Sequence, residues 1–162
     1  MSRTARPVAD WVPLSTWILS LAGLGISGYL TFTHFAGTQY LACSDAGVVN
    51  CGVVTTSAES YFLGVPVAVL GLVTYAVLGV LNSPFAWRWR PYWIHVARLV
   101  IVVGAMAFVL WLVAAELLII DHICLWCTGV HVVTFALFVV MAYVAPTQLG
   151  SSGAGESAAP SR

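Results

Sequence analysis

The residues of this chain whose type and spacing could do chemistry are its four cysteines. Cys124 and Cys127 form the motif Cys-Leu-Trp-Cys, and Cys43 and Cys51 lie in an earlier polar stretch with seven residues between them. When such a C-x-x-C pair opens a helix, unpaired N–H groups and the helix dipole stabilise a thiolate on the first cysteine, and a lowered thiol pKa speeds thiol–disulfide exchange. The motif therefore predicts redox chemistry, with Cys124 nearer the helix end and Cys127 one turn deeper.

Two other arrangements of the four cysteines are open. They could form two structural disulfides, which are common in oxidising compartments. They could bind zinc, although the seven residues between Cys43 and Cys51 exceed the roughly two to four that usually separate zinc ligands. A redox relay is favoured because one pair lies in a loop and the other on a helix, and a relay needs a shuttle as well as a fixed acceptor.

The composition indicates which elements position these cysteines. Hydrophobic residues make up 60% of the 162 residues and charged residues only 7%, whereas soluble domains carry about 25% charged residues. Six arginines balance six acidic residues, so the chain offers no basic surface for nucleic acid. These values exclude a water-soluble globule and predict an all-α integral membrane protein.

Four apolar segments are each long enough to cross about 30 Å of hydrocarbon as a helix. They predict a four-transmembrane-helix bundle with spans at about 11–35, 61–82, 94–120 and 122–146, and with an extracytoplasmic loop at 37–59 between the first two helices. The chain has to reverse between the last two spans, and we expect the turn at Asp121-His122, with Asp121 capping the following helix. Residues 1–10 and 147–162 are expected to be cytoplasmic, the latter as a disordered tail.

The arginines set the orientation of these spans. With four spans and a cytoplasmic N-terminus, all six fall on or near the cytoplasmic side, as the positive-inside rule requires: Arg3, Arg6, Arg88, Arg90, Arg98 and Arg162. All four cysteines then fall on the other side, together with Asp45, Glu59 and Asp121. The sequence therefore predicts a multi-pass protein of the bacterial cytoplasmic membrane with its cysteine site in the oxidising extracytoplasmic compartment.

Over residues 12–146 the chain resembles the vitamin K epoxide reductase family in its bacterial single-domain form. The likeness is carried by the four spans, by Cys43-x7-Cys51, by Ser57 six residues after Cys51, by Gly64-Val65-Pro66 and by the Cys124–Cys127 motif. It implies a membrane thiol:quinone oxidoreductase that oxidises a thioredoxin-fold dithiol protein, reduces menaquinone or ubiquinone, and supports disulfide bond formation. Because the chain ends in a short polar tail, with no fused thioredoxin domain, the partner is expected to be a separate protein.

The resemblance also implies a role for each cysteine. The loop disulfide Cys43–Cys51 would carry electrons from the partner to Cys124, and Cys127 would face the quinone. Which of the two loop cysteines meets the partner is open at this point. Two alternatives to this activity are a quinone or vitamin K epoxide reductase on the same fold, and a non-catalytic membrane subunit held together by disulfides.

Four further residues are weighed near the quinone. Ser57 would donate a hydrogen bond close to the head group, or it would cap a loop turn. His131 stands where vertebrate members have a quinone-contacting Tyr and Ser60 where they have Asn, and both can still form hydrogen bonds with a carbonyl oxygen. An intramembrane histidine is a functional candidate by default, so His131 is expected either at the quinone or in a helix-to-helix hydrogen bond. Glu116, two turns before Cys124, would lie either near the site or at the outer head groups, and the head groups are the favoured position.

Overall fold

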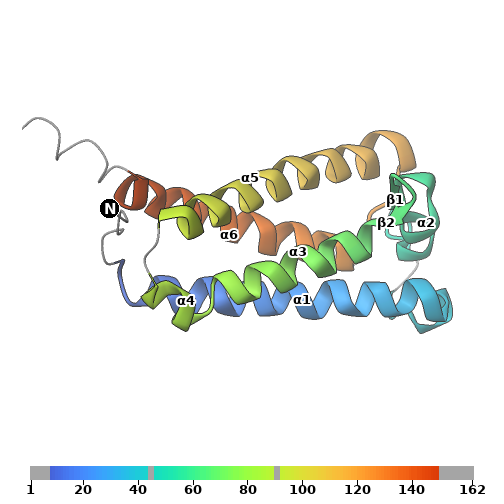
Figure 1. Cartoon of the computed structure of the whole chain (residues 1–162). Helices are drawn as coiled ribbons and strands as arrows, with labels where there is room; N and C mark the ends of the chain where they lie inside the picture. The colour runs from blue at the N-terminus through green and yellow to red at the C-terminus, as the bar shows by residue number, and fades with distance from the viewer. Residues whose placement is uncertain (1–7, 44–45, 90–91, 150–162) are drawn as a thin grey trace, which may run out of the picture.

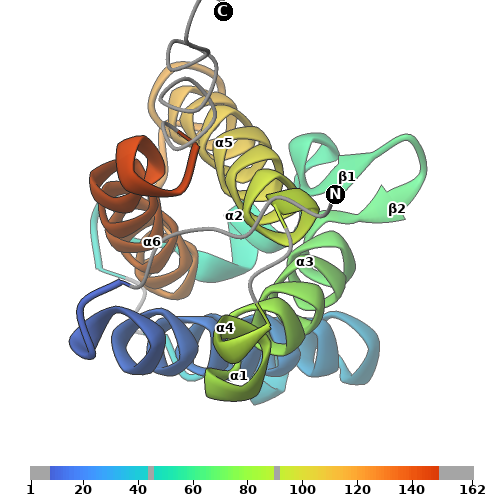
Figure 2. The same ribbon diagram turned by 60° about the vertical axis from the view of Figure 1, so that its left-hand side comes forward.

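Long helices run side by side along the whole length of the molecule. The computed structural model describes residues 8–43, 46–89 and 92–149, so the N-terminus up to residue 7 and the tail from residue 150 lie outside the described residues. α1 packs against α3 and α6, and α5 packs against α6, in an elongated bundle (Figures 1 and 2). The bounds of these helices are α1 Trp11–Ala36, α3 Val67–Leu81, α5 Tyr92–Ala115 and α6 Leu125–Leu149.

By length and composition, three of the described helices are able to cross a membrane. They are Trp11–Ala36, Tyr92–Ile120 and Leu125–Gln148. Helix α3 is also apolar but has only 15 residues, or about 22 Å, which is less than the roughly 30 Å of a bilayer core. The expectation of a mostly helical membrane protein is therefore confirmed.

The segment before α3 differs from the predicted span at 61–82. Strand β1, Tyr61–Phe62, pairs antiparallel with β2, Val65–Pro66. The two residues of the turn, Leu63 and Gly64, both have positive φ angles, 51° and 80°, as a tight hairpin turn requires. Pro66 further restricts the residue before it to extended backbone. The helix consequently begins at Val67 rather than at residue 61.

The reversal before the last helix also differs from the prediction. After α5 the chain makes a π-helical turn, η3 Glu116–Ile120, and Asp121 ends it in the left-handed conformation with φ 56°, which Asp tolerates better than most residues. Helix α6 begins at Leu125 rather than at residue 122, so the prediction that Asp121 caps it was wrong. Helix α6 also continues to Leu149, so residues 147–149 of the predicted disordered tail are helical.

The predicted loop at 37–59 contains short elements. They are η1 Thr38–Tyr40, α2 Cys51–Thr56 and η2 Ala58–Ser60. With the β-hairpin they cover one end of the bundle, while α4, Pro84–Arg88, lies at the other end (Figure 1). One end of the bundle therefore carries the loop cysteines.

A close approach and buried hydrogen bonds hold α1, α3 and α6 together. Gly23 of α1 lies so near the ring of Tyr75 that any added Cβ would overlap the ring. The Tyr75 hydroxyl forms a hydrogen bond with Thr134 Oγ1 (2.7 Å) and donates to the Val130 carbonyl (3.2 Å). Small residues and interhelical hydrogen bonds are the usual means of helix association in lipid.

At the α4 end, a buried arginine ties α3, α4 and α5 together. Arg98 is 1% exposed. Its guanidinium donates to the carbonyl of Leu81, the last residue of α3, and lies 3.9 Å from the ring centroid of Trp87. The charge therefore lies at the end of the bundle opposite the cysteines, where carbonyl and aromatic groups stabilise it.

Candidate active site

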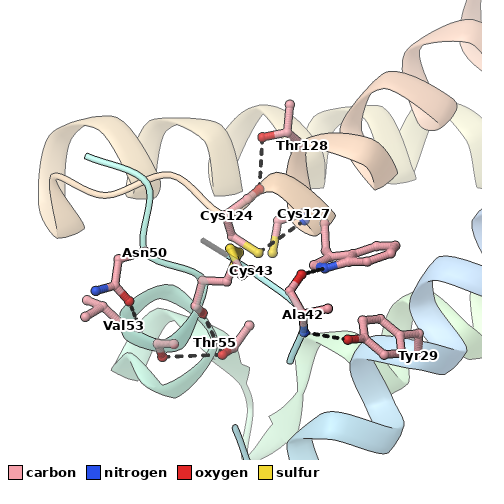
Figure 3. Close-up of a disulfide and its surroundings, with 12 residues drawn as sticks. Tyr29, Ala42, Cys43, Asn50, Val53, Thr55, Cys124, Cys127 and Thr128 are labelled. Carbon is pink, nitrogen blue, oxygen red and sulfur yellow. Dashed lines mark hydrogen bonds between the residues drawn. A yellow bond between two sulfur atoms is a disulfide. The ribbon is translucent and has the colours of Figure 1, made fainter. Parts of the chain in front are cut away.

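All four cysteines meet at one end of the bundle, where α2 lies against the start of α6 (Figures 1 and 3). Cys51 and Cys124, both 0% exposed, form a buried cluster with Val54, and the partly buried Cys43 and Cys127 pack against it. Cys43 and Cys51 are joined by a disulfide, and Cys124 and Cys127 are free thiols. The fold thus brings together the two pairs that the sequence predicts to exchange electrons.

Backbone pairing holds Cys51 beside Cys124. Val49 and Ile123 form a parallel β-bridge, in which Ile123 N–H donates to the Val48 carbonyl (2.8 Å) and Asn50 N–H donates to the Ile123 carbonyl (3.1 Å). Each cysteine follows this bridge closely along its own chain segment. The Asn50 side chain then accepts from Val53 N–H (2.9 Å) and starts α2 at Cys51.

The segment before Cys43 is held by side chains instead. The Tyr29 hydroxyl accepts from Ala42 N–H (2.7 Å) and donates to the Tyr40 carbonyl (2.8 Å). The Trp126 indole N–H donates to the Ala42 carbonyl (2.8 Å), and the rings of Tyr29 and Trp126 are 4.6 Å apart between centroids. The residue next to Cys43 is therefore bound through both its N–H and its carbonyl group (Figure 3).

Cys124 lies immediately before α6, and its sulfur takes the place of a capping oxygen. Cys127 N–H donates to Cys124 Sγ (3.3 Å), which is the usual pattern of a helix N-cap. A hydrogen bond from the Cys127 thiol lowers the pKa of Cys124, and the N–H groups of Cys127 and Trp126 lower it further, against the opposing effects of burial and of the Glu116 charge. Cys124 is thus favoured as a thiolate, as expected of the first cysteine of such a motif.

A cavity of about 160 Å³ lies between the long helices, below α2 and η2. Most of its lining is apolar and comes from α1, α3, α5 and α6. Cys127 is the only one of the four cysteines in that lining. The polar side chains that share the lining with Cys127 include His34, Ser57, Ser60, Glu116 and His131. The two cysteines of one motif therefore face different surroundings, since Cys124 packs on the loop disulfide and Cys127 borders the cavity.

Ser57, Ser60 and His131, all weighed near the quinone, border this cavity. Ser57 donates from its hydroxyl to the Val54 carbonyl (2.9 Å) and makes no side-chain cap of η2. His131 is 9% exposed and lies one turn after Cys127 on α6. Ser60, the last residue of η2, donates to the carbonyl of Ser57, which precedes η2 (2.7 Å), so the two serines are linked at the wall of the cavity.

Glu116 lies at this site rather than at the outer head groups, so that expectation was wrong. It is 6% exposed, borders the cavity and accepts a hydrogen bond from Cys124 N–H. The next three residues, Leu117, Leu118 and Ile119, are all exposed, because the wider π-helical turn faces them outward and Glu116 inward. An acidic residue in an apolar span was the signal that could have placed it, since such residues are functional by default.

His34 is a second residue that the sequence did not place at the site. Its Nε2 forms a hydrogen bond with the Tyr61 hydroxyl (3.1 Å), which links α1 to the β-hairpin at the cavity wall. In the sequence His34 lies near the end of the first apolar run, a position that favours the membrane interface. The hairpin that brings Tyr61 over it could not be expected from an apolar run that resembles a helix.

A metal centre finds no support in the described ranges. Residues 8–43, 46–89 and 92–149 hold no group of three or more His, Cys, Asp and Glu arranged for a metal ion. Two of the four cysteines are already bonded to each other. A disulfide beside two thiols is the combination that thiol–disulfide exchange uses.

Comparison with known families agrees with this geometry. The sequence model described as the Vitamin K epoxide reductase family matches residues 14–142, which is most of the chain and includes all four cysteines. Members of this family are membrane oxidoreductases that use cysteines and a quinone as electron carrier. From the motif spacing, the paired cysteines and this match, we conclude that the chain belongs to the vitamin K epoxide reductase family.

Proposed function

We propose that this protein is a thiol:quinone oxidoreductase that oxidises an extracytoplasmic thioredoxin-fold dithiol protein and reduces a membrane quinone, and so supports disulfide bond formation. One observation carries the proposal. Cys124 packs against Cys51 of the loop disulfide while Cys127 borders an apolar cavity. A single C-x-x-C motif therefore adjoins both a thiol carrier and a space for a lipid-soluble acceptor.

Electrons enter at Cys43 in this proposal, because Cys43 is partly exposed and Cys51 is fully buried. A partner thiolate attacks Cys43 Sγ, forms a mixed disulfide and releases Cys51 as a thiolate. The partner's second thiol then attacks the partner's first sulfur, which is bonded to Cys43 in the mixed disulfide. That step releases Cys43 as a thiolate and leaves the partner oxidised.

The loop then passes its two electrons to the helix pair. The Cys51 thiolate attacks Cys124 of a Cys124–Cys127 disulfide, and Cys127 leaves as a thiolate. Cys43 attacks Cys51 in the new Cys51–Cys124 bond, which restores the loop disulfide and releases Cys124. The lowered pKa of Cys124 makes it a good leaving group in this second exchange.

The cavity supports a quinone, such as menaquinone or ubiquinone, as the acceptor. Its lining is largely apolar, and its volume of about 160 Å³ is close to that of an engineered cavity of about 150 Å³ that binds benzene. Ser57 and His131 border it with groups that can form hydrogen bonds with carbonyl oxygens, and Cys127 borders it with the reacting sulfur. When bound, the quinone supplies a two-electron acceptor that leaves as a quinol.

We further propose that α3 is a fourth membrane span and that the cysteine end lies outside the bacterial cytoplasmic membrane. Glu59, Glu116 and Asp121 lie at the cysteine end, whereas Arg88 and Arg98 lie at the α4 end. This distribution follows the positive-inside rule. In this proposal residues 1–10 and the tail from 147 lie on the cytoplasmic side.

The decisive experiment mixes the purified protein with a reduced thioredoxin-fold protein and a soluble quinone and follows quinone absorbance. We expect quinone loss that depends on the dithiol, that Cys127→Ser abolishes, and that Thr128→Ser leaves at the wild-type rate. Loss that persists in Cys127→Ser would overturn the proposal. Faster turnover of vitamin K epoxide than of quinone would identify an epoxide reductase, and no turnover of either would indicate a subunit merely held together by disulfides.

A further inference from the structure

The two loop cysteines are held at the site by different kinds of contact. Cys51 follows a segment that is paired with Ile123 through main-chain hydrogen bonds on both sides of the bridge. Cys43 follows Ala42, whose N–H and carbonyl groups bind the side chains of Tyr29 and Trp126. The anchor of Cys51 is therefore part of the backbone framework, while the anchor of Cys43 depends on two side chains.

These two side chains come from different helices and support each other. Tyr29 lies on α1 and Trp126 on α6, and their rings are in contact at 4.6 Å between centroids. The Tyr29 hydroxyl also donates to the Tyr40 carbonyl, so it holds the chain at two points before Cys43. Trp126 stands between the two cysteines of the C-x-x-C motif, so the same short segment carries the helix pair and binds the residue before Cys43.

We infer that Tyr29 and Trp126 act as a latch on the arm formed by residues 40–43, holding Cys43 next to Cys51 while the loop disulfide is closed and releasing Cys43 when the disulfide opens. This inference rests on the proposed function. Attack by the partner breaks the Cys43–Cys51 bond, after which Cys51 stays paired beside Ile123 and Cys43 is held only by the latch. The arm can then move with the partner while Cys51 remains in place against Cys124.

The latch has a thermodynamic consequence for the loop disulfide. Because its contacts are made while the disulfide is closed and are lost when the arm moves away, the latch shifts the redox equilibrium of the loop pair toward the closed disulfide. Each neutral hydrogen bond of this kind changes an equilibrium constant by about fivefold. Removal of the latch should therefore make the loop disulfide easier to reduce without moving Cys51 from Cys124.

The test measures the redox equilibrium of the loop pair alone. In a Cys124→Ala/Cys127→Ala background, the full-length protein is equilibrated in thiol–disulfide buffers and the fraction of open Cys43–Cys51 is counted by alkylation and mass spectrometry. Both Trp126→Phe and Tyr29→Phe keep an aromatic ring. We expect Trp126→Phe, which loses one hydrogen bond, to lower the equilibrium constant for disulfide closure by about fivefold. Tyr29→Phe loses two and should lower it more, and the double variant should lower it further. Tyr143→Phe and Trp111→Phe, exposed aromatic residues outside the site, are the matched controls and should leave it unchanged.

Hydrogen exchange gives a second readout in the unmodified protein. The Ala42 amide should exchange slowly while the disulfide is closed and faster once it is reduced, whereas the Asn50 amide should stay protected in both forms. Equal closure constants in wild type and double variant, or an Ala42 amide that stays protected after reduction, would overturn the latch. Neither readout involves quinone or partner, so failure of the quinone assay with a shifted closure constant would count against the proposed function and leave the anchoring role of the latch intact.

Discussion

Cys51 and Cys124 are both fully buried and pack in one cluster, although one lies in the loop after α1 and the other precedes α6. The Val49–Ile123 bridge sets this contact through backbone hydrogen bonds. Cys51 is accordingly placed to exchange with Cys124, while Cys43 is placed closer to solvent. Five predictions test this division and the surroundings of the two pairs.

Removal of Cys43 should trap the internal exchange. In Cys43→Ala, oxidation of the helix pair by quinone lets Cys51 attack Cys124, and with Cys43 gone the product can be opened only by the return attack of Cys127. We expect the Cys51–Cys124 disulfide to accumulate, detected after acid quenching as a cross-linked peptide pair by mass spectrometry. The matched variant Cys51→Ala should give no comparable Cys43–Cys124 bond, and a Cys43–Cys124 bond of equal yield would contradict the assigned order.

The thiol of Cys127 should control the acidity of Cys124. Its hydrogen bond is the largest cause that lowers the pKa of Cys124, so Cys124 keeps its thiolate to lower pH than an ordinary cysteine and loses it as pH falls through that lowered pKa. In a Cys43→Ala/Cys51→Ala background, Cys127→Ala should move the pH profile of Cys124 alkylation to higher pH. Cys127→Ser keeps a donor and should move it less, and an equal move in both variants would count against the thiol hydrogen bond.

Glu116 should act on Cys124 in the opposite direction. Its negative charge raises the pKa of Cys124 against the net lowering, so neutralising it removes a repulsion of the thiolate. Glu116→Gln keeps an acceptor for Cys124 N–H. In the same assay we expect the pH profile of Cys124 alkylation to move to lower pH in this variant. Asp121→Asn, which neutralises an exposed acid at the same end, is the control. An unchanged alkylation profile in Glu116→Gln would show that the Glu116 carboxylate does not influence the pKa of Cys124.

His131 should affect quinone binding more than thiol exchange. It borders the cavity one turn from Cys127, so His131→Leu removes a polar group from the wall while Cys124 keeps its contacts with the loop. We expect the KM for quinone to rise about fivefold for one lost hydrogen bond, with the rate of loop disulfide reduction by a dithiol unchanged. His131→Gln should restore part of the affinity, and an unchanged KM in both variants would place His131 in helix packing only.

Gly23 should be required for the contact between α1 and α3. A Cβ at this position overlaps the Tyr75 ring, so Gly23→Ala should destabilise the protein by about 1–3 kcal/mol through overpacking. Gly25→Ala is the matched control on the same helix, because a Cβ there meets no atom within 4 Å beyond its own stretch of helix and alanine favours helix. Thermal unfolding in detergent measures both, and equal midpoints for the two variants would argue against the tight contact.

The positions of the helices and of the cysteine pairs could be predicted from the sequence because they follow from long apolar runs and a short motif. The β-hairpin at Tyr61–Pro66 could not, since its residues continue the apolar run and only Gly64 and Pro66 hint at a turn. The inward position of Glu116 depends on the π-helical turn, which no residue pattern announces. The roles of Tyr29 and Trp126 could not be predicted from the sequence, because their hydrogen bonds go to backbone groups far along the chain.

The Val49–Ile123 bridge determines which mutations the site tolerates. Its hydrogen bonds join main-chain atoms of Val48, Asn50 and Ile123, so the alignment of the two sulfurs does not depend on the identity of the side chains at positions 48, 49 and 123. Proline is the exception at positions 50 and 123, because it has no N–H to donate. Sequence drift in these segments can therefore reshape the outer surface, and with it the choice of partner, while the distance over which electrons pass between the two pairs stays the same.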